Sequence, residues 1–187
     1  MTLLSAGVLV WILVHLVPGL FTGLRGSIIE KIGKHAYRGL VALGVLGGIG
    51  LVIAGWRSSA VVPLYEPLPL AGWIAFVLIL PAFILFAAFR SNIKRFIRHP
   101  QLLGMTLWSS AHLLVNGDGR SAILFGGLLF WSLLMMWLLN RRDGAWQKPA
   151  PVSLTGDAIA LLIGINLFIA LLFSHVWLFG VSPLDVL

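Results

Sequence analysis

One stretch decides how this chain folds, and it reads Arg98-His-Pro-Gln-Leu-Leu-Gly-Met-Thr-Leu-Trp-Ser-Ser-Ala-His-Leu-Leu-Val-Asn-Gly-Asp118. Pro100 stands where the first turn of a helix is expected, and the polar residues from Asn116 onward mark its end. His99 lies at the start of this apolar segment and His112 lies inside it. Because an ionisable side chain at membrane depth costs free energy, each of these histidines is a candidate for a functional site.

Composition places the chain in a membrane. Of its 187 residues, 59% are hydrophobic and 10% are charged, and the mean hydropathy is +1.01. A soluble domain carries roughly a quarter of charged residues. We therefore predict an all-α, polytopic membrane helix bundle that forms a single domain over residues 1–187. Because the chain has no cysteine, disulfides, thiolate metal sites and cysteine nucleophiles are excluded.

The hydropathy pattern predicts about six transmembrane helices, at residues 3–21, 37–56, 70–89, 100–115, 121–139 and 154–179. The N-terminus lacks the basic region and cleavage site of a signal peptide, so the first helix is expected to be retained. Three glycines in the second span, Gly44, Gly47 and Gly48, are expected to permit close packing of helices. A nucleotide-binding loop is not expected there, because no strand precedes these glycines.

Basic residues are concentrated in every second loop. Of the 13 Lys and Arg residues, only Arg57 and Arg120 lie on the other side of the predicted membrane. The positive-inside rule then places both termini outside and the basic loops in the cytoplasm. Topology therefore accounts for the net charge of +7, with lipid headgroups or an acidic partner as the alternative. The expected partner of the chain is the lipid bilayer, not nucleic acid.

Two histidines are expected at similar depth in the membrane. His15 lies about two turns before the inner end of the first span, and His112 lies about three turns into the fourth span. At a rise of 1.5 Å per residue, their heights differ by about 5 or 6 Å. Imidazole is the usual ligand of haem iron, and the core of a helix bundle is a usual place for it. The alternative for each histidine is a hydrogen bond to a neighbouring helix.

The spacing around His112 indicates which residues support it. Trp108 at i−4 and Asn116 at i+4 share its helix face. Asn116 is placed to accept the second N–H of a ligating imidazole, and Asp118 is expected to cap the following helix. Asp157 is expected in the first turn of the last helix.

The remaining histidines lie near the predicted interfaces. His99 is a candidate for a helix start, a headgroup contact or a cofactor contact, because a histidine at the interface costs little. His35 and His175 are expected to be ordinary interface residues, with His175 as a reserve ligand.

Several motifs carry a resemblance to a known family. They are the signature Arg98-His-Pro-x-x-Leu-Gly-x-x-x-Trp-x-x-Ala-His-Leu-Leu-x-Asn-Gly-Asp118 and the shorter strings His15-Leu-Val-Pro18, Gly23-Leu-Arg25, Tyr37-Arg-Gly-Leu40, Leu80-Pro-Ala-Phe83 and Ser121-Ala-Ile-Leu-Phe-Gly126. With these the chain resembles the NnrU family of bacterial membrane proteins, most strongly over residues 8–140. The resemblance implies a multi-pass protein of the bacterial inner membrane with periplasmic termini. It also implies an association with denitrification, specifically with nitrite and nitric oxide reduction.

NnrU proteins are also similar to the plant and cyanobacterial 15-cis-zeta-carotene isomerases, which are membrane haem b proteins with paired histidine ligands. By this resemblance the haem ligands fall on His15 and His112, with Trp108, Asn116 and His99 as further cofactor-binding candidates. The resemblance implies either a haem b protein that transfers electrons, senses or matures partners in nitrogen-oxide metabolism, or a haem-dependent cis-trans isomerase of a polyene or lipid. Fold similarity alone does not decide between these activities.

Two further alternatives stay open. The fragment Arg98-His-Pro-x-x-x-Gly104 is similar to a motif of membrane methyltransferases that use S-adenosylmethionine. In those enzymes an aromatic residue stands where this chain has Leu102, and the acidic residues expected around the cofactor are missing here. A haem-free structural partner of a larger complex is the remaining reading, and it is expected if His15 and His112 prove dispensable.

Overall fold

The computed structural model describes residues 1–186, and the secondary-structure elements in that range are helices. The α-helices are α1 (Thr2–Leu20), α2 (Thr22–Ile32), α3 (Lys34–Ser58), α4 (Ala71–Ala87), α5 (Pro100–Val115), α6 (Gly119–Asp143) and α7 (Leu154–Phe179). Two short 3₁₀ helices, η1 (Asn92–Arg95) and η2 (Pro183–Val186), complete them. The all-α prediction is confirmed for this part of the chain. Leu187, the last residue of the predicted domain, lies outside the described residues.

Helices occupy all of the stretches in which transmembrane spans are expected. Among the described residues, α1, α3, α6 and α7 are long and apolar enough to cross a membrane, and α4 is a shorter apolar helix. The chain is therefore a membrane protein, while the count of six crossings stays a prediction. The prediction missed α2, because the segment between the first two spans was taken as a loop. The signal was there: Leu24 and Ile28 stand at i and i+4 on one face.

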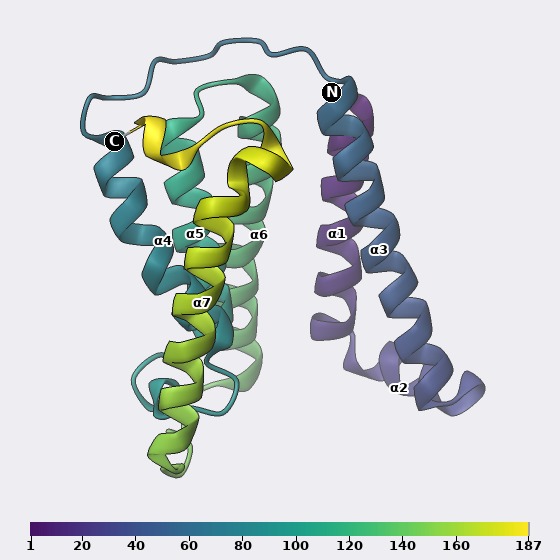
Figure 1. Cartoon of the computed structure of the whole chain (residues 1–187). Helices are drawn as coiled ribbons and strands as arrows, with labels where there is room; N and C mark the ends of the chain where they lie inside the picture. The colour runs from purple at the N-terminus through teal and green to yellow at the C-terminus, as the bar shows by residue number, and fades with distance from the viewer. Residues whose placement is uncertain (187) are drawn as a thin grey trace.

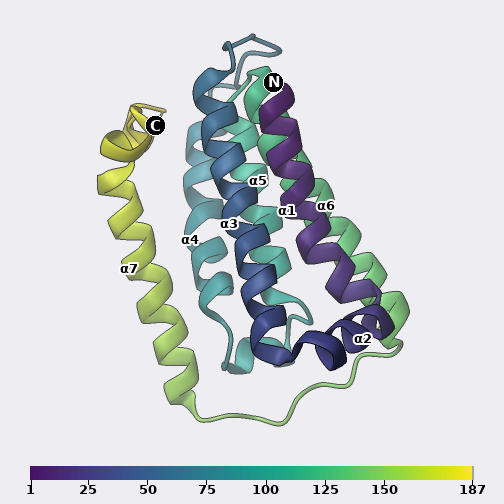
Figure 2. The ribbon, with the colours of Figure 1, turned by 90° about the vertical axis from the view of Figure 1, so that its right-hand side faces the viewer.

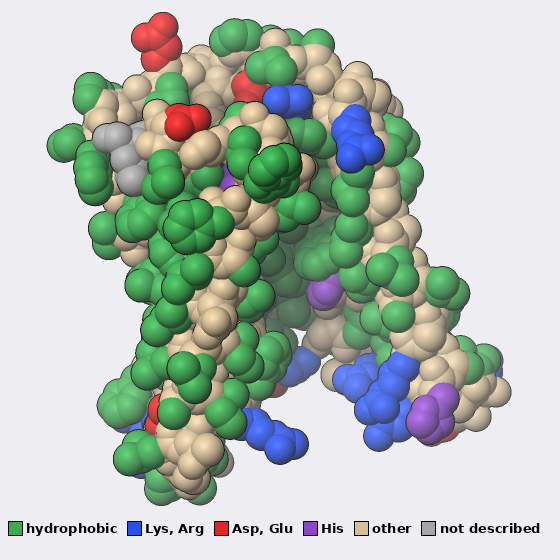
Figure 3. All heavy atoms as spheres, viewed as in Figure 1, with side chains coloured by type: hydrophobic (Ala, Val, Ile, Leu, Met, Phe, Trp, Pro, Cys, Tyr) green, Lys and Arg blue, Asp and Glu red, His purple; other side chains and the backbone are tan. Residues whose placement is uncertain are grey.

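The helices form two groups that meet at α6. α1 pairs with α3, while α4 packs against both α5 and α7, and α6 packs against both α5 and α1. Figure 1 shows the α1–α3 pair on one side and the group of α4, α5, α6 and α7 on the other, and Figure 2 views the molecule with the pair toward the reader. Both termini lie at the same end of the molecule (Figure 1), which is what an even number of crossings requires. Most of the Lys and Arg side chains visible in Figure 3 lie at the opposite end.

Glycines let α1 and α3 approach closely. A Cβ atom added to Gly48 would lie 3.3 Å from the backbone nitrogen of Trp11, and one added to Gly44 would lie 2.8 Å from Cγ2 of Val14. The predicted role of these two glycines is confirmed. It is wrong for Gly47, where an added Cβ would meet nothing within 4 Å because this residue faces away from α1.

The loop between α3 and α4 folds over the C-terminal end of α5 and the N-terminal end of α6. The amide of Leu64 donates to the carbonyl of Gly117 at 2.7 Å, and the amide of Gly119 donates to the carbonyl of Val62 at 2.9 Å. The Tyr65 hydroxyl donates to the carbonyl of Asn116 at 3.1 Å and also bonds the carbonyl of Leu113. Backbone carbonyls at the end of α5 are thereby satisfied, as buried helix ends require.

We predict that the Tyr65 hydroxyl ionises at a higher pH than the hydroxyl of a free tyrosine. Partial burial and then the negative charge of Asp118 raise the pKa of Tyr65. Its folded-state pKa thus lies above the unfolded value of about 10, so its contribution to stability is present below about pH 10 and is lost as the pH rises through the folded value. Ultraviolet titration of the Tyr37→Phe variant, which leaves Tyr65 as the single tyrosine, measures this midpoint. Asp118→Asn should lower it, and a midpoint at or below the peptide value would contradict the contact.

The start of α7 is fixed to the segment between α4 and α5. The carboxylate of Asp157 accepts from the Asn92 amide at 2.7 Å and from the Asn92 side chain at 2.6 Å. Asn92 also exchanges two hydrogen bonds of 3.0 Å with the backbone of Val152. Asp157 lies in the first turn, as predicted, but it binds another segment as well.

We predict that Asp157→Ala loosens α7. Removing a carboxylate that accepts two hydrogen bonds is expected to cost about 1–3 kcal/mol and to leave Asn92 donors unsatisfied. Limited proteolysis of residues 144–153 should become faster, with a lower midpoint of thermal unfolding in detergent. Glu30→Ala is the matched control, since within residues 1–186 Glu30 forms no ion pair. Equal proteolysis rates for the two variants would show that the Asn92–Asp157 contact does not hold α7.

Candidate functional site

His15 lies on the side of α1 that faces α6. Its Nδ1–H donates to the carbonyl of Trp11 at 2.7 Å. Its ring centroid lies 4.2 Å from the ring of Trp11, and the edge of Trp131 on α6 approaches it at 5.4 Å. The indole N–H groups of Trp11 and Trp131 are buried and find no acceptor within the part of the chain that the structure describes.

His112 on α5 repeats this arrangement. Its Nδ1–H donates to the carbonyl of Trp108 at 2.8 Å, and its ring lies 4.4 Å from the ring of Trp108. Phe125 on α6 stacks on the imidazole at 4.5 Å with an interplanar angle of 27°. Trp56 of α3 approaches the same phenylalanine at 6.2 Å. The two histidines are thus centres of two similar units, each of the form Trp-x-x-x-His.

The hydrogen bond at Nδ1 has a chemical consequence for both rings. When Nδ1 carries the proton, Nε2 of a neutral imidazole keeps its lone pair. A backbone carbonyl that accepts from Nδ1 also orients the ring and raises the basicity of Nε2 as a ligand. His15 and His112 therefore each present one nitrogen that can bind a metal.

The two imidazoles pack against different residues of α6. They contact α6 at Trp131 and Phe125, which are six residues apart and hence about 9 Å apart along the helix axis. His175, the reserve ligand, instead bonds the carbonyl of Val181 through its Nδ1 at 2.8 Å.

A cavity of about 420 Å³ opens beside His15, at the end of the bundle where α5 begins. Its walls combine apolar residues of α5 and α6 with polar residues from the start of α5, and its lining is His15, Lys94, Arg98, His99, Pro100, Gln101, Leu102, Trp131, Met135 and Leu139. Figure 3 shows a hollow between the two helix groups, with a histidine side chain visible at its edge. The cavity brings His15 together with His99, and His112 is not part of its lining.

The Arg98-His99-Pro100 motif joins α5 to the end of α6. Nε2 of His99 donates to Oδ1 of Asn140 at 3.0 Å, and Arg98 donates to the carbonyl of Gly144 at 2.8 Å. Pro100 is the first residue of α5, as predicted, with His99 as the residue that caps it. The motif therefore has a structural role that the sequence did not reveal, because Asn140 is 41 residues further along.

The supporting residues around His112 act differently from expectation in one case. Trp108 shares the helix face of His112, as predicted, and its ring packs on the imidazole. The carbonyl of Trp108, not Asn116, accepts the second N–H of His112. The Asn116 side chain instead donates to the His112 carbonyl at 2.8 Å, which closes the end of α5. Asp118 caps α6, as predicted, by accepting from the amides of Arg120 and Ser121 at 3.0 and 3.1 Å.

Trp11 and Trp131 were missed in the sequence. For Trp11 the signal was available, because its spacing to His15 equals that of Trp108 to His112. For Trp131 no local signal exists, since its contact depends on how α6 packs against α1. His35 lies exposed near the start of α3, away from both histidine units.

The NnrU family model, described as NnrU protein, matches residues 3–183. The chain therefore belongs to the NnrU family, and the resemblance seen in its motifs is confirmed over nearly its whole length. No curated protein and no solved structure matches the chain.

Proposed function

We propose that this NnrU-family protein binds haem b in the membrane, held between His15 and His112, and takes part in nitrite and nitric oxide reduction. The observation that carries the proposal is the pair of Trp-x-x-x-His units on α1 and α5, each with Nδ1 bonded to a backbone carbonyl. Both histidines have Nδ1 bonded and Nε2 free, and two such imidazoles on different helices could together ligate one haem. The denitrification role follows from the family association alone.

The donor set suits a haem better than a bare metal ion. Within residues 1–186, no group of three or more His, Cys, Asp or Glu side chains is arranged to hold a metal. Protein zinc sites need three or four such ligands. In haem, the porphyrin supplies four nitrogen ligands to the iron, so the protein needs to supply only one or two more. The buried, unpaired indole N–H groups beside His15 are donors that the carboxylates of a bound group would satisfy.

The residues around the two histidines would orient the cofactor and keep it dry. The carbonyls of Trp11 and Trp108 fix the two imidazoles with Nε2 free. Aromatic rings of Trp131 and Phe125 cover the α6 side of each unit and exclude water. When bound, haem b supplies a one-electron redox centre, whose potential depends on ligand identity, hydrogen bonding and burial. In this proposal the protein serves as an electron-transfer, sensing or maturation factor of the bacterial inner membrane, with six crossings and periplasmic termini.

The assignment of His112 as the second haem ligand is tested by comparing its substitution with that of His99. His112→Ala is expected to reduce the haem content of the purified protein by about tenfold or more, because loss of even an outer partner of a ligand costs about 10–100-fold in affinity. His99→Ala should retain most of the haem, and His35→Ala should retain all of it. The measurement is the haem-to-protein ratio by pyridine haemochrome. Retention in His112→Ala with loss in His99→Ala would instead assign the second ligand to the cavity beside His15.

The cavity beside His15 favours a second candidate, a haem-dependent cis-trans isomerase of a polyene or other lipid. Its α6 wall is made by Trp131, Met135 and Leu139, which suit an apolar chain. Incubating the haem-loaded protein with a cis-polyene, reduced and then oxidised, and separating the isomers by chromatography tests this activity. Conversion in one redox state only would support it, and an unchanged isomer ratio in both states would exclude it.

A further inference from the structure

The short helix α2 is held across the inner ends of α1 and α3 by two joints of one residue each. Phe21 alone separates α1 from α2, and Gly33, with φ of +82°, alone separates α2 from α3. The amides of both joints bond back into the preceding helix, at 2.9 Å to Val17 and 2.8 Å to Ile29. Figure 2 shows α2 lying across the ends of α1 and α3.

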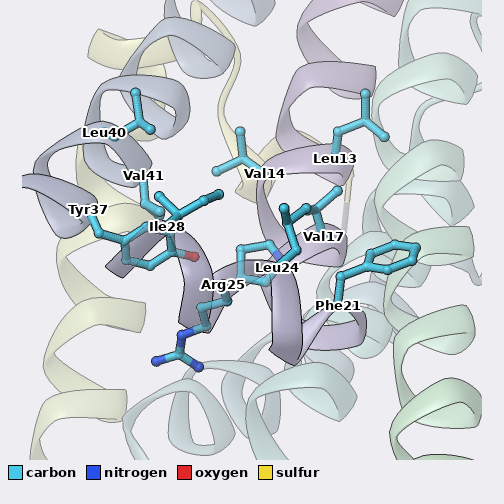
Figure 4. Close-up of a pocket in the computed structure, with 11 residues that line it drawn as sticks. Leu13, Val14, Val17, Phe21, Leu24, Arg25, Ile28, Tyr37, Leu40 and Val41 are labelled. Carbon is cyan, nitrogen blue, oxygen red and sulfur yellow. The ribbon is translucent and has the colours of Figure 1, made fainter. Parts of the chain in front are cut away.

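A pocket of about 160 Å³ lies between these three helices. Figure 4 shows that its walls are aliphatic, with contributions from each helix, and the lining comprises Leu13, Val14, Val17, Pro18, Phe21, Leu24, Arg25, Ile28, Tyr37, Leu40 and Val41. An apolar cavity of about 150 Å³ is known to hold a benzene-sized group. This pocket is thus large enough for the first carbons of an acyl chain.

Two polar groups stand at the edge of this apolar pocket. The guanidinium of Arg25 and the hydroxyl of Tyr37 both lie among its lining residues (Figure 4). Across residues 1–186, neither group forms a salt bridge or a side-chain hydrogen bond. The unpaired guanidinium and phenol suit the anionic headgroup of an amphiphile. The apolar walls of the pocket suit its hydrocarbon chain.

The surroundings add charge of the same sign. Three further cations, Lys31, Lys34 and Arg38, lie exposed on α2 and the first turns of α3, against the single acid Glu30. Anionic lipids of the cytoplasmic leaflet attract such basic segments next to a membrane span. The pocket itself lies at the end of two helices that are apolar enough to span the membrane, which is where headgroups begin.

We propose that the α1–α2–α3 pocket binds one anionic phospholipid, with an acyl chain against Val14, Val17 and Ile28 and the phosphate against Arg25 and Tyr37. This site is separate from the two histidine units and does not depend on haem. Its ligand is distinguished from bulk lipid by the combination of a shaped aliphatic pocket and an unpaired guanidinium. A zwitterionic phospholipid offers the same chains but presents a cationic group beside its phosphate, so it is expected to bind less well.

Native mass spectrometry of the detergent-purified full chain, titrated with phosphatidylglycerol or phosphatidylcholine, tests the proposal. The wild type is expected to retain one phosphatidylglycerol preferentially. Arg25→Gln should reduce that retention several-fold, whereas Lys31→Gln, on the same helix but outside the pocket, should leave it unchanged. Val17→Phe, which fills the pocket without altering charge, should also reduce retention, with a thermal melt to verify that it folds.

Several results would overturn the site. Equal retention of the two lipids by the wild type would remove the role of headgroup charge. An equal loss in Arg25→Gln and Lys31→Gln would mean diffuse attraction to a basic surface. Displacement of the lipid by inorganic phosphate alone would mean that the pocket contributes nothing. If Val17→Phe fails to fold, the comparison of Arg25→Gln with Lys31→Gln decides alone.

Discussion

His15→Gly protein is expected to purify without haem and to regain it when millimolar imidazole is added to the buffer. The glycine removes the Nε2 donor and leaves a space beside Trp11 and Trp131 that a free imidazole fits. Since disturbing only an outer partner of a metal ligand costs about 10–100-fold in affinity, loss of the ligand should cost at least as much. Haem content and the Soret band, measured with and without imidazole, provide the readout.

The imidazole rescue separates ligation from a merely structural role. His35→Gly is the matched control, because His35 lies exposed and away from the histidine units. Its haem content should equal that of the wild type, with or without imidazole. A His15→Gly protein that folds, melts like the wild type and still holds a full complement of haem would show that His15 is not a ligand.

Gly55→Leu is expected to cause the largest loss of stability in the α1–α3 pair. A Cβ at Gly55 would collide with the backbone of Leu4, which is itself fully buried. Backbone cannot move aside as a flexible side chain can, so the helices must separate. Overpacking of this kind typically lowers the free energy of unfolding by about 1–3 kcal/mol. Because the leucine side chain would meet backbone, we expect a loss of about 3 kcal/mol or more. The midpoint of thermal unfolding in detergent should fall accordingly.

The control for this variant lies on the same helix. An added Cβ at Gly47 meets nothing within 4 Å, so Gly47→Leu changes helix propensity and apolar surface without touching α1. It should melt at or above the wild-type temperature, because leucine favours a helix over glycine by nearly 1 kcal/mol. If both variants melt alike, the close approach of α1 and α3 does not contribute to stability.

The elements that could be predicted are those whose signal is local. Apolar runs of sufficient length marked the long helices, and the position of Asp118 before an apolar run marked it as a cap. Pro100 likewise marked the first turn of α5. These predictions depend only on neighbouring residues, and the structure bears them out.

What could not be predicted depends on how helices meet. Asn140 as the partner of His99 and Trp131 as the neighbour of His15 both come from α6, and nothing near either histidine indicates them. The contact between Trp11 and His15 is the exception, because the same Trp-x-x-x-His spacing at Trp108 and His112 could have predicted it from the sequence.

The most direct test of the account is the absorption spectrum of the detergent-purified wild-type protein, oxidised and then reduced with dithionite, with a pyridine haemochrome assay on the same sample. If His15 and His112 hold haem b, we expect a Soret band, sharp α and β bands on reduction, and the haemochrome of haem b at one haem per chain. Such bands indicate low-spin iron, which ligation by two histidines would give. A folded protein that stays colourless after expression with added haem would contradict the proposed role of His15 and His112.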